Sequence, residues 1–360
     1  MPAYHFSVHY RVVLMLAAAF AVAMLAPGCA PAASREEHSG TRPRWPNPEL
    51  QGKINIDGSS TVFPISEAAA SQFRQRYPNV SVNVGVSGTG GGFKRFIRGE
   101  IDISDASRPI GAREFDSALQ AGITAIELPI AYDGLTVVVH NDNDWVDQLT
   151  IEEIHTIYAA SKAAKRWSDI RPGFPDRPIQ PFAPGTDSGT FEYFREIVIG
   201  AKESLRSDMS TSEDDNVLVT GVAGSAGSIG FFGAAYFEEN RHRVRAVPIV
   251  DPQTGKAVLP SSETIESGEY SPLSRPLFIY VANGSAGRPE VKRFIEFFLE
   301  HGPQLASAAG YVALPPAIYQ AGLTNFRHRH TGTHYLTAEG EKREGAVTEV
   351  FQSHNLREGR

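Results

Sequence analysis

The sequence predicts an α/β fold of two domains, each with a mainly parallel sheet flanked by helices. The chain has 360 residues, and at about 150 residues per domain this length suggests two domains with separate cores. Segments that alternate polar and apolar residues are repeatedly followed by segments with helical spacing, an order typical of parallel sheets. The composition, with 41% hydrophobic and 21% charged residues, excludes a disordered chain and a polytopic membrane protein.

The first predicted elements follow one another closely along the chain. Residues 53–57 alternate as a strand does, and the helical stretch Ile65–Tyr77 is closed by a proline. Val80–Val86 is a second strand by its period and composition. After a loop of small residues, we expect a helix at Phe93–Arg98 and a short strand at Ile101–Ile103.

Two strongly apolar strands, Leu135–Val139 and Leu277–Val281, lie far apart in the sequence. We expect the chain to cross between the domains there, with most of a second α/β unit in Trp145–Tyr270. The clearest part of that unit is a strand, a loop and a helix, at Ile179–Phe182, Gly185–Thr190 and Phe191–Val198. The helix Pro289–Glu300 has one apolar stripe and should pack on a core.

Charge and cysteine content narrow the classes of function. The formal net charge is −7, with 34 basic and 41 acidic residues, which argues against a nucleic-acid binder that neutralises many phosphates. A single cysteine excludes an intrachain disulfide and a cysteine-rich zinc site. His328, His330 and His334 lie close together, but two arginines interleave with them. We expect a solvated basic loop there rather than a metal site, and we expect no cofactor.

The two ends of the chain have their own composition. Residues 1–28 are predicted to be a signal peptide, because the apolar run Val12–Leu25 is shorter than the ~20 residues of a membrane span. The run leads into Cys29 through a segment that resembles the lipobox of bacterial lipoproteins, so we expect a lipid anchor on Cys29. The alternative is a soluble periplasmic protein cut within Ala30–Ser34. Residues 29–50 should form a flexible tether, and the polar residues 337–360 a loosely attached extension.

Three loops share one arrangement, in which a strand is followed by small hydroxyl-bearing residues and glycines and then by a helix. They are Gly58–Thr61, Ser87–Gly92 and Asp187–Thr190. The start of a helix has unpaired N–H groups and a partial positive charge, and glycine lets an oxyanion approach the backbone. Any one of these loops is explained by ordinary helix capping. The three together favour a site for a tetrahedral oxyanion.

Motifs of the common enzyme classes are missing from these loops. The dinucleotide fingerprint, the phosphate-binding loop of nucleotide hydrolases and the G-x-S-x-G elbow do not occur. Asp187, Ser188 and Gly189 have the order found around some serine-protease nucleophiles, but His140 and His155 do not lie in a recognisable motif. A serine hydrolase that uses Ser188 is therefore the alternative from another class of function.

At these loops the sequence resembles the substrate-binding proteins of phosphate ABC transporters. The resemblance covers about residues 51–300 and rests on six segments in the order of the family, which are Asp57–Pro64, Ser87–Gly92, Asp105–Pro109, Gly185–Thr190, Ser212–Asn216 and Pro272–Leu277. It implies a periplasmic-binding-protein fold of the second type, in which two lobes joined by a hinge of crossing strands close over phosphate. It implies no chemistry on the ligand.

The resemblance also implies which groups hold the anion. Carried over by position, the hydroxyl and backbone donors of the two lobes are Ser60, Thr61, Thr89, Ser107, Ser188, Gly189 and Thr190. Many members of the family have an arginine where this chain has Pro184. Arg108 is the obvious substitute cation, since its guanidinium could contact phosphate in a bidentate way. The alternative for Arg108 is a surface ion pair with Asp105 or Glu100.

A second departure concerns the acceptor for the proton that phosphate carries and sulfate lacks. Many members have an aspartate where this chain has Ser107. We expect Asp187 to be this acceptor, and the next candidates are Asp57 and Asp105. A buried acceptor penalises an anion without the proton, because the acceptor then stays unpaired.

For the whole chain we predict a lipid-anchored, extracytoplasmic, monomeric phosphate-binding protein that is not an enzyme. Its lobes would comprise 51–134 with 277–336, and 135–276. Its partners would be inorganic phosphate, the permease subunits of an ABC importer and the membrane that holds the anchor, but no nucleic acid. The alternative within the same class is a binder or sensor of another tetrahedral oxyanion.

Overall fold

The computed structural model describes residues 49–186, 188–200, 202–212 and 214–359. The predicted signal peptide, nearly all of the tether and Cys29 lie outside these residues, as does Asp187. The described residues all belong to one compact unit. Within them, none of the helices has the length and apolar character needed to cross a membrane.

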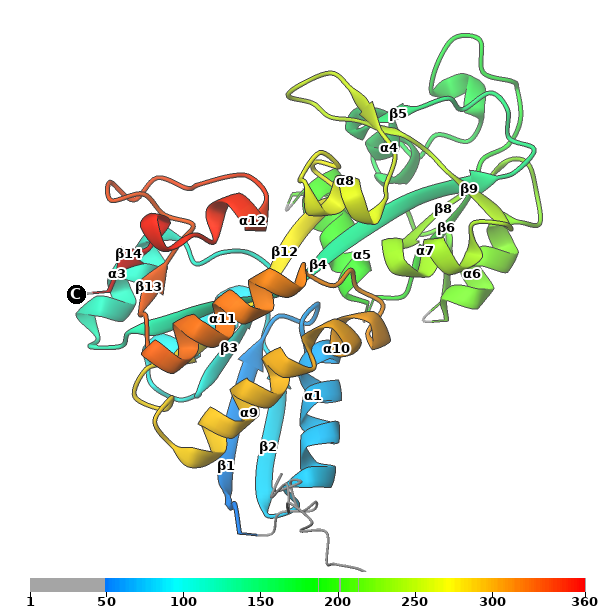
Figure 1. The fold of residues 1–360 in the computed structure, drawn as a ribbon. Coiled ribbons are helices and arrows are strands. Elements are labelled where there is room, and N and C mark those ends of the chain that lie inside the picture. The colour runs from blue at the N-terminus through cyan, green and yellow to red at the C-terminus, as the bar shows by residue number, and fades with distance from the viewer. Residues whose placement is uncertain (1–48, 187, 201, 213, 360) are drawn as a thin grey trace, which may run out of the picture. The chain divides into compact units, whose positions relative to one another are not determined.

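Three parallel strands begin the fold (Figure 1). The strand β1 (Gly52–Gly58) lies between β2 (Val80–Val86) and β3 (Ile103–Ala106), with Ile54 beside Val82 and Ile56 beside Ile103. The connections are helical, at α1 (Phe63–Arg76) and α2 (Thr89–Ile97), and α3 (Ala112–Gln120) follows β3. Parallel strands joined by helices place all three strand ends at one edge of the sheet, where loops form binding sites.

Two long strands connect this part of the fold to the rest. The strand β4 (Ala125–His140) has 16 residues and runs antiparallel to β12 (Ser274–Ala282), with Ala131 opposite Leu277. These strands contain the two apolar runs that we expected to cross between domains. In the described residues they belong to one sheet with the order β2-β1-β3-β12-β4-β8-β6-β7, and β9 also pairs with β4.

The second part of the sheet repeats the parallel arrangement. The strand β6 (Gln180–Pro184) is parallel to both β7 (Ser210–Ser212) and β8 (Ser228–Gly233), and β9 is Val244–Ala246. The helices here are α4 (Ile151–Tyr158), α5 (Gly189–Phe194), α6 (Asp215–Val222), α7 (Ala234–Asn240) and α8 (Ser262–Glu266). The helix α5 continues into a wider turn at Arg195–Ile199. A small sheet joins β5 (Leu149–Thr150), β10 (Ile249–Val250) and β11 (Ala257–Val258).

We call β1–β3 with the helices packed on them the β1 half, and β6–β9 with their helices the β8 half. Three later helices, α9 (Pro289–Glu300), α10 (Gly302–Ala308) and α11 (Pro316–His328), return to the β1 half. The ring of Phe73 on α1 lies 5.2 Å from that of Phe294 on α9. The bounds of α9 are those predicted from its apolar stripe. The expected limits of the two lobes remain a prediction.

The C-terminal segment differs from the expectation of a loosely attached extension. It forms β14 (Arg357–Glu358), which pairs with β13 (Gly332–Thr333), and a helical turn α12 (Val347–Val350) whose Val347 is fully buried. The guanidinium of Arg343 donates to three backbone carbonyls, at distances of 3.0, 2.6 and 2.7 Å. The prediction was wrong because a few apolar residues and one arginine anchor a segment whose composition is mostly polar.

A buried acidic network ties this segment to the central strands. Glu127 on β4 is 1% exposed and accepts hydrogen bonds from Tyr280 Oη (2.8 Å) and Thr333 Oγ1 (2.5 Å). The backbone N–H of His334 donates to the same carboxylate at 2.8 Å. A buried carboxylate is stable in a protein when donors surround it in this way.

Candidate functional site

The loops at the ends of β1 and β3 touch through their backbones. Gly58 has φ +147°, and a Cβ atom there would lie 2.1 Å from the carbonyl oxygen of Asp105. The N–H of Ser59 donates to that carbonyl at 3.0 Å. Gly92 on α2 also lies close to this strand end, since a Cβ atom on it would lie 2.7 Å from Gly58 Cα. Glycine is required at the strand end, and the loops after β1 and β3 are held against the start of α2.

Two predicted donors of the β1 half lie together at the start of α2. Thr89 Oγ1 is 3.1 Å from Ser107 Oγ and accepts from the N–H of Ser107 at 3.2 Å. Ser107 is buried, and so is Thr61 on the loop after β1. Hydroxyl groups of this kind can donate to an anion, because their hydrogens rotate to suit the acceptor.

The start of α5 brings the β8 half to the same place. Ser188 caps this helix by accepting from the N–H of Phe191 at 3.5 Å. Thr61 Oγ1 lies 3.5 Å from the carbonyl oxygen of Gly189, and a Cβ atom on Gly189 would lie 2.5 Å from Thr61 Cα. A cavity of about 580 Å³ runs beside this contact, and Ser60, Ser188, Gly189 and Thr190 are among the residues that line it.

Arg108 takes part in an ion pair inside the β1 half. Its two terminal nitrogens each donate to a different carboxylate oxygen of Glu114, both at 2.8 Å. The guanidinium also lies over the ring of Phe93, 5.5 Å from its centre. This agrees with the alternative of an ion pair for Arg108, although Glu114 is the partner in place of Asp105 or Glu100.

Arg275 on β12 is a cation at the loops that the sequence did not indicate as a site residue. Its Nη2 donates to Thr61 Oγ1 at 3.3 Å, and the guanidinium lies 3.7 Å from the ring centre of Tyr193 on α5. Its Nε donates to Asp133 at 3.3 Å and its Nη1 to Glu196 at 3.0 Å. Arg275 lies within Pro272–Leu277, one of the segments that carry the family resemblance, and this is the feature of the sequence that could have indicated it as a site residue.

The three candidate carboxylates differ in what surrounds them. Asp187 lies outside the described residues. Asp57 accepts hydrogen bonds from Ser87 and from Arg95. Asp105 is fully buried, and one of its oxygens accepts from Ser66 Oγ at 3.0 Å while the other, Oδ2, has no partner in the described residues.

The electrostatics of Asp105 are unusual for a carboxyl. Burial raises the pKa of Asp105 to about 8, the hydrogen bond from Ser66 opposes the shift, and the charge of Asp57 adds to it. The carboxyl is therefore largely protonated at neutral pH. Of the two candidate aspartates that the structure describes, Asp105 is the one with a carboxyl oxygen that lacks a hydrogen-bond partner.

The remaining predicted groups have other partners. His334 contacts Glu127, with Nδ1 3.0 Å from the carboxylate, whereas His328 and His330 are exposed and stack on one another. In the described part of the chain, the acidic, histidine and cysteine side chains do not form a group of three suited to a metal ion.

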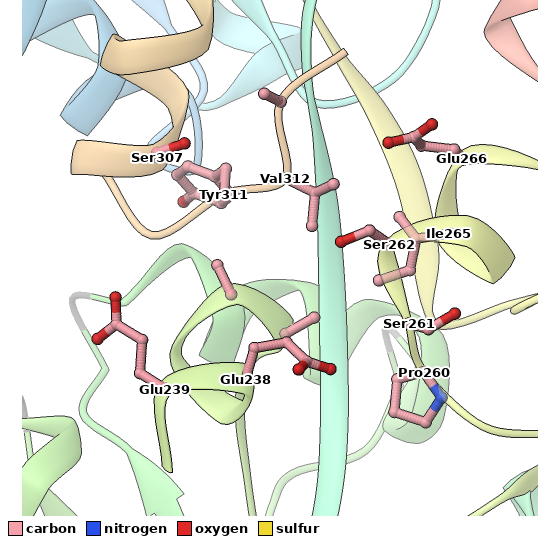
Figure 2. Close-up of a pocket in the computed structure, with 13 residues that line it drawn as sticks. Glu238, Glu239, Pro260, Ser261, Ser262, Ile265, Glu266, Ser307, Tyr311 and Val312 are labelled. Carbon is pink, nitrogen blue, oxygen red and sulfur yellow. The ribbon is translucent and has the colours of Figure 1, made fainter. Parts of the chain in front are cut away.

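A second cavity, of about 380 Å³, lies between α7, α8 and the end of α10 (Figure 2). Its acidic side chains are Glu238, Glu239 and Glu266, and burial raises the pKa of Glu266. None of the predicted anion donors lines it. Tyr311 connects the two places, since it lines both cavities and donates to the carbonyl oxygen of Thr61 at 2.8 Å. An acidic lining disfavours an anion.

Comparisons with known proteins agree with this architecture. Residues 45–301 match the model of a PBP superfamily domain. The protein SphX of Synechococcus elongatus is 47% identical over 282 residues, which are 78% of this chain and 83% of that protein. The phosphate-binding protein PstS of Staphylococcus haemolyticus is 39% identical over 280 residues, which are 78% of this chain and 86% of that protein.

A solved structure gives the same result. The crystal structure of a possible phosphate-binding protein from Planctomyces limnophilus is 46% identical, with a TM-score of 0.75, and the match covers 78% of this chain and 99% of that one. The chain therefore belongs to the PBP superfamily, within which its relatives are the SphX and PstS proteins. The predicted fold class is confirmed.

Proposed function

We propose that this protein captures inorganic phosphate between its two halves and delivers it to an ABC importer. The observation that supports this most is the meeting of hydroxyl-bearing loops from both halves at Thr61 and Gly189. Relatives that are named phosphate-binding proteins and match over most of this chain support the same ligand.

The donors suit a tetrahedral oxyanion in a protein of negative net charge. Thr61, Thr89 and Ser107 offer hydroxyls, and the start of α5 offers N–H groups with a partial positive charge. Such aimed dipoles replace the hydration shell of an anion without a large positive field. Closure of the halves would add the contacts that hold the ligand.

In this proposal, the carboxyl of Asp105 accepts the hydrogen bond that the proton of phosphate can donate. Above pH 8 the carboxyl is ionised, so it accepts a hydrogen bond from hydrogen phosphate but repels sulfate, which has no proton to give. Below that pH the carboxyl itself carries a proton that sulfate can accept. The preference for phosphate over sulfate should therefore rise as the pH increases through about 8.

Isothermal titration of the mature protein with phosphate and with sulfate, at pH 6.5 and pH 9, tests this function. We expect phosphate binding at micromolar concentrations, weakened on the order of 10-fold in Thr61→Val, because one hydroxyl donor to a charged ligand is lost. Thr324→Val is the matched control, since this exposed hydroxyl bonds to the carbonyl of Gln320 on α11. Absence of phosphate binding in the unmodified protein would refute the proposal.

The finer statements about the protein belong to the same proposal. We infer that it acts without catalysis, as a monomer outside the cytoplasm, held to a membrane through Cys29. Ser188 serves as a helix cap, and none of the described histidines hydrogen-bonds to its hydroxyl. Recovery of the protein in the detergent phase, lost on Cys29→Ser, would support the anchor, and recovery of both forms in the aqueous phase would contradict it.

A further inference from the structure

Arg275 and Glu196 form an ion pair where the two halves meet. We propose that Arg275 is the cation that binds the anion in this protein, and that the carboxylate of Glu196, which pairs with Arg275, competes with the ligand for it. The inference rests on the proposed function, and it assigns a binding residue and an internal competitor to the site.

The position of Arg275 is the first argument. Arg275 lies opposite Asp133 in the pairing of β12 with β4, so its backbone is fixed on a central strand. From there its guanidinium reaches Thr61 of the β1 half and Tyr193 of the β8 half. Ser107, Glu196 and Arg275 also line one cavity of about 430 Å³, which is within the usual size range of small-molecule sites, about 300–1,000 Å³.

The second argument is the balance of charge around this guanidinium. Asp133 is 1% exposed, and burial raises its pKa in spite of Arg275. The side chain of Glu196 is 58% exposed, whereas that of Arg275 is 13% exposed. Because an exposed carboxylate regains its hydration when it leaves, Glu196 is the partner that an incoming anion displaces, and Asp133 stays.

The other arginines near the loops have buried or paired partners within the β1 half. Arg108 is held in a bidentate pair by Glu114, and Arg95 contacts both Asp57 and Glu100. Among the described residues, neither forms a hydrogen bond or an ion pair with the β8 half, although Arg108 lines the same cavity as Arg275 and Glu196. Arg275 contacts both halves, so its contacts change when the halves close.

A second carboxylate of the same helix supports the competition. Glu192, four residues before Glu196, accepts a hydrogen bond from Ser60 Oγ. Two carboxylates from the β8 half thus accept from two donors that face the loops, a hydroxyl and a guanidinium. The same hydroxyl and guanidinium could donate equally well to the oxygens of phosphate, so these carboxylates compete with the ligand for its donors.

Titration of the full mature protein with inorganic phosphate at low salt tests the inference through three variants. Arg275→Gln should weaken binding on the order of 100-fold, because a charge-assisted hydrogen bond is lost. Glu196→Gln should tighten binding about 2- to 5-fold, and this gain should shrink at 1 M salt, where an exposed pair is screened. Arg108→Gln should retain most of the affinity.

Matched controls test whether the loss of any arginine or glutamate charge changes phosphate affinity, or only the loss of the charges at Arg275 and Glu196. Arg288→Gln removes an arginine that also pairs with one aspartate, Asp102, and one glutamate, Glu290. Glu67→Gln removes an exposed partner at the same 3.0 Å distance from an arginine, Arg74. Both should leave phosphate affinity within about 2-fold, the effect of a remote surface charge.

Because Arg275→Gln leaves Asp133 buried without its ion pair, Arg275→Lys and the double variant Arg275→Gln with Asp133→Asn are measured beside it. Both should fold and bind phosphate at least about 10-fold more weakly than the unmodified protein. Unchanged affinity in the double variant, or a large loss in Arg108→Gln alone, would overturn the inference while leaving the proposed function intact. If the unmodified protein fails to bind, the proposed function itself is refuted.

Discussion

In the β1 half the candidate site is built from three loops whose backbones touch, whereas the β8 half contributes one helix start and two carboxylates. The β1 half places Thr89 beside Ser107, and it also contains the fully buried carboxyl of Asp105, which accepts a hydrogen bond from Ser66 on α1. The β8 half meets these donors through Gly189, with Glu192 and Glu196 nearby on the same helix. In the function that we propose, the β1 half therefore acts as a fixed receptor, and the β8 half closes over the anion and contributes the competing carboxylates.

The largest effect should come from the buried carboxyl of the fixed half. The pKa of Asp105 is raised from its ordinary value of 3.8 to about 8, so the folded protein binds more protons than the unfolded chain between these pH values. The contribution of this group to stability should therefore be highest below pH 4 and fall as the pH rises to about 8, by several kcal/mol, with about 6 kcal/mol as the upper bound.

Urea unfolding across pH 4–9 measures this dependence. Asp105→Asn should remove the fall over this range, and Asp142→Asn, which changes an exposed carboxylate, should preserve it. An unchanged profile in Asp105→Asn would mean that Asp105 is ionised in the folded protein at neutral pH.

The next largest effect should come from replacing a glycine with alanine, a change that we expect to affect stability in the β1 half and phosphate affinity in the β8 half. Gly58→Ala places a methyl group 2.1 Å from a carbonyl oxygen at a φ of +147°. We expect a loss of about 3 kcal/mol in the free energy of unfolding, from steric overlap and backbone strain. Gly284→Ala, where a Cβ atom would meet nothing within 4 Å, is the control. Equal stability of the two variants would show that the β1 loops are not rigid.

Gly189→Ala makes the same change in the β8 half with a different expected result. The added methyl group would meet Thr61 across the contact between the halves, 2.5 Å from its Cα. Opening the halves relieves this clash, so the melting temperature without ligand should change little. Phosphate affinity should fall on the order of 100-fold, because closure and its contacts become unfavourable. A strong loss of stability in place of affinity would contradict the division between a fixed half and a closing half.

The parts of the fold that could be predicted from the sequence depend on local pattern. Val80–Val86 and Pro289–Glu300 match β2 and α9 because alternation, an apolar stripe and a leading proline are visible along the chain. The loops at Thr61, Thr89 and Gly189 were found in the same way, since small residues at helix starts have a physical meaning of their own. In the structure Thr61 contacts Gly189 and Thr89 contacts Ser107, and the part of these residues in binding an anion stays a prediction.

The parts that could not be predicted depend on pairing between distant segments. Only the end of β4 was recognised, because Glu127 and Asp133 interrupt its apolar pattern, and their partners come from β12 and the C-terminal segment. Arg108 was preferred because it follows Ser107 in the sequence. The contacts of Arg275 follow from the register of β12 against β4, which a single sequence does not reveal.

The donors around Glu127 have a consequence for where this protein can be divided. The superfamily match ends at residue 301, yet Thr333 and His334, which donate hydrogen bonds to a carboxylate inside the matched region, come after it. A recombinant fragment trimmed to the matched residues would leave that carboxylate buried with Tyr280 as its one remaining side-chain donor. The boundary given by similarity therefore leaves out residues that hydrogen-bond to the matched region, and a C-terminal truncation should spare at least β13 and its partner β14.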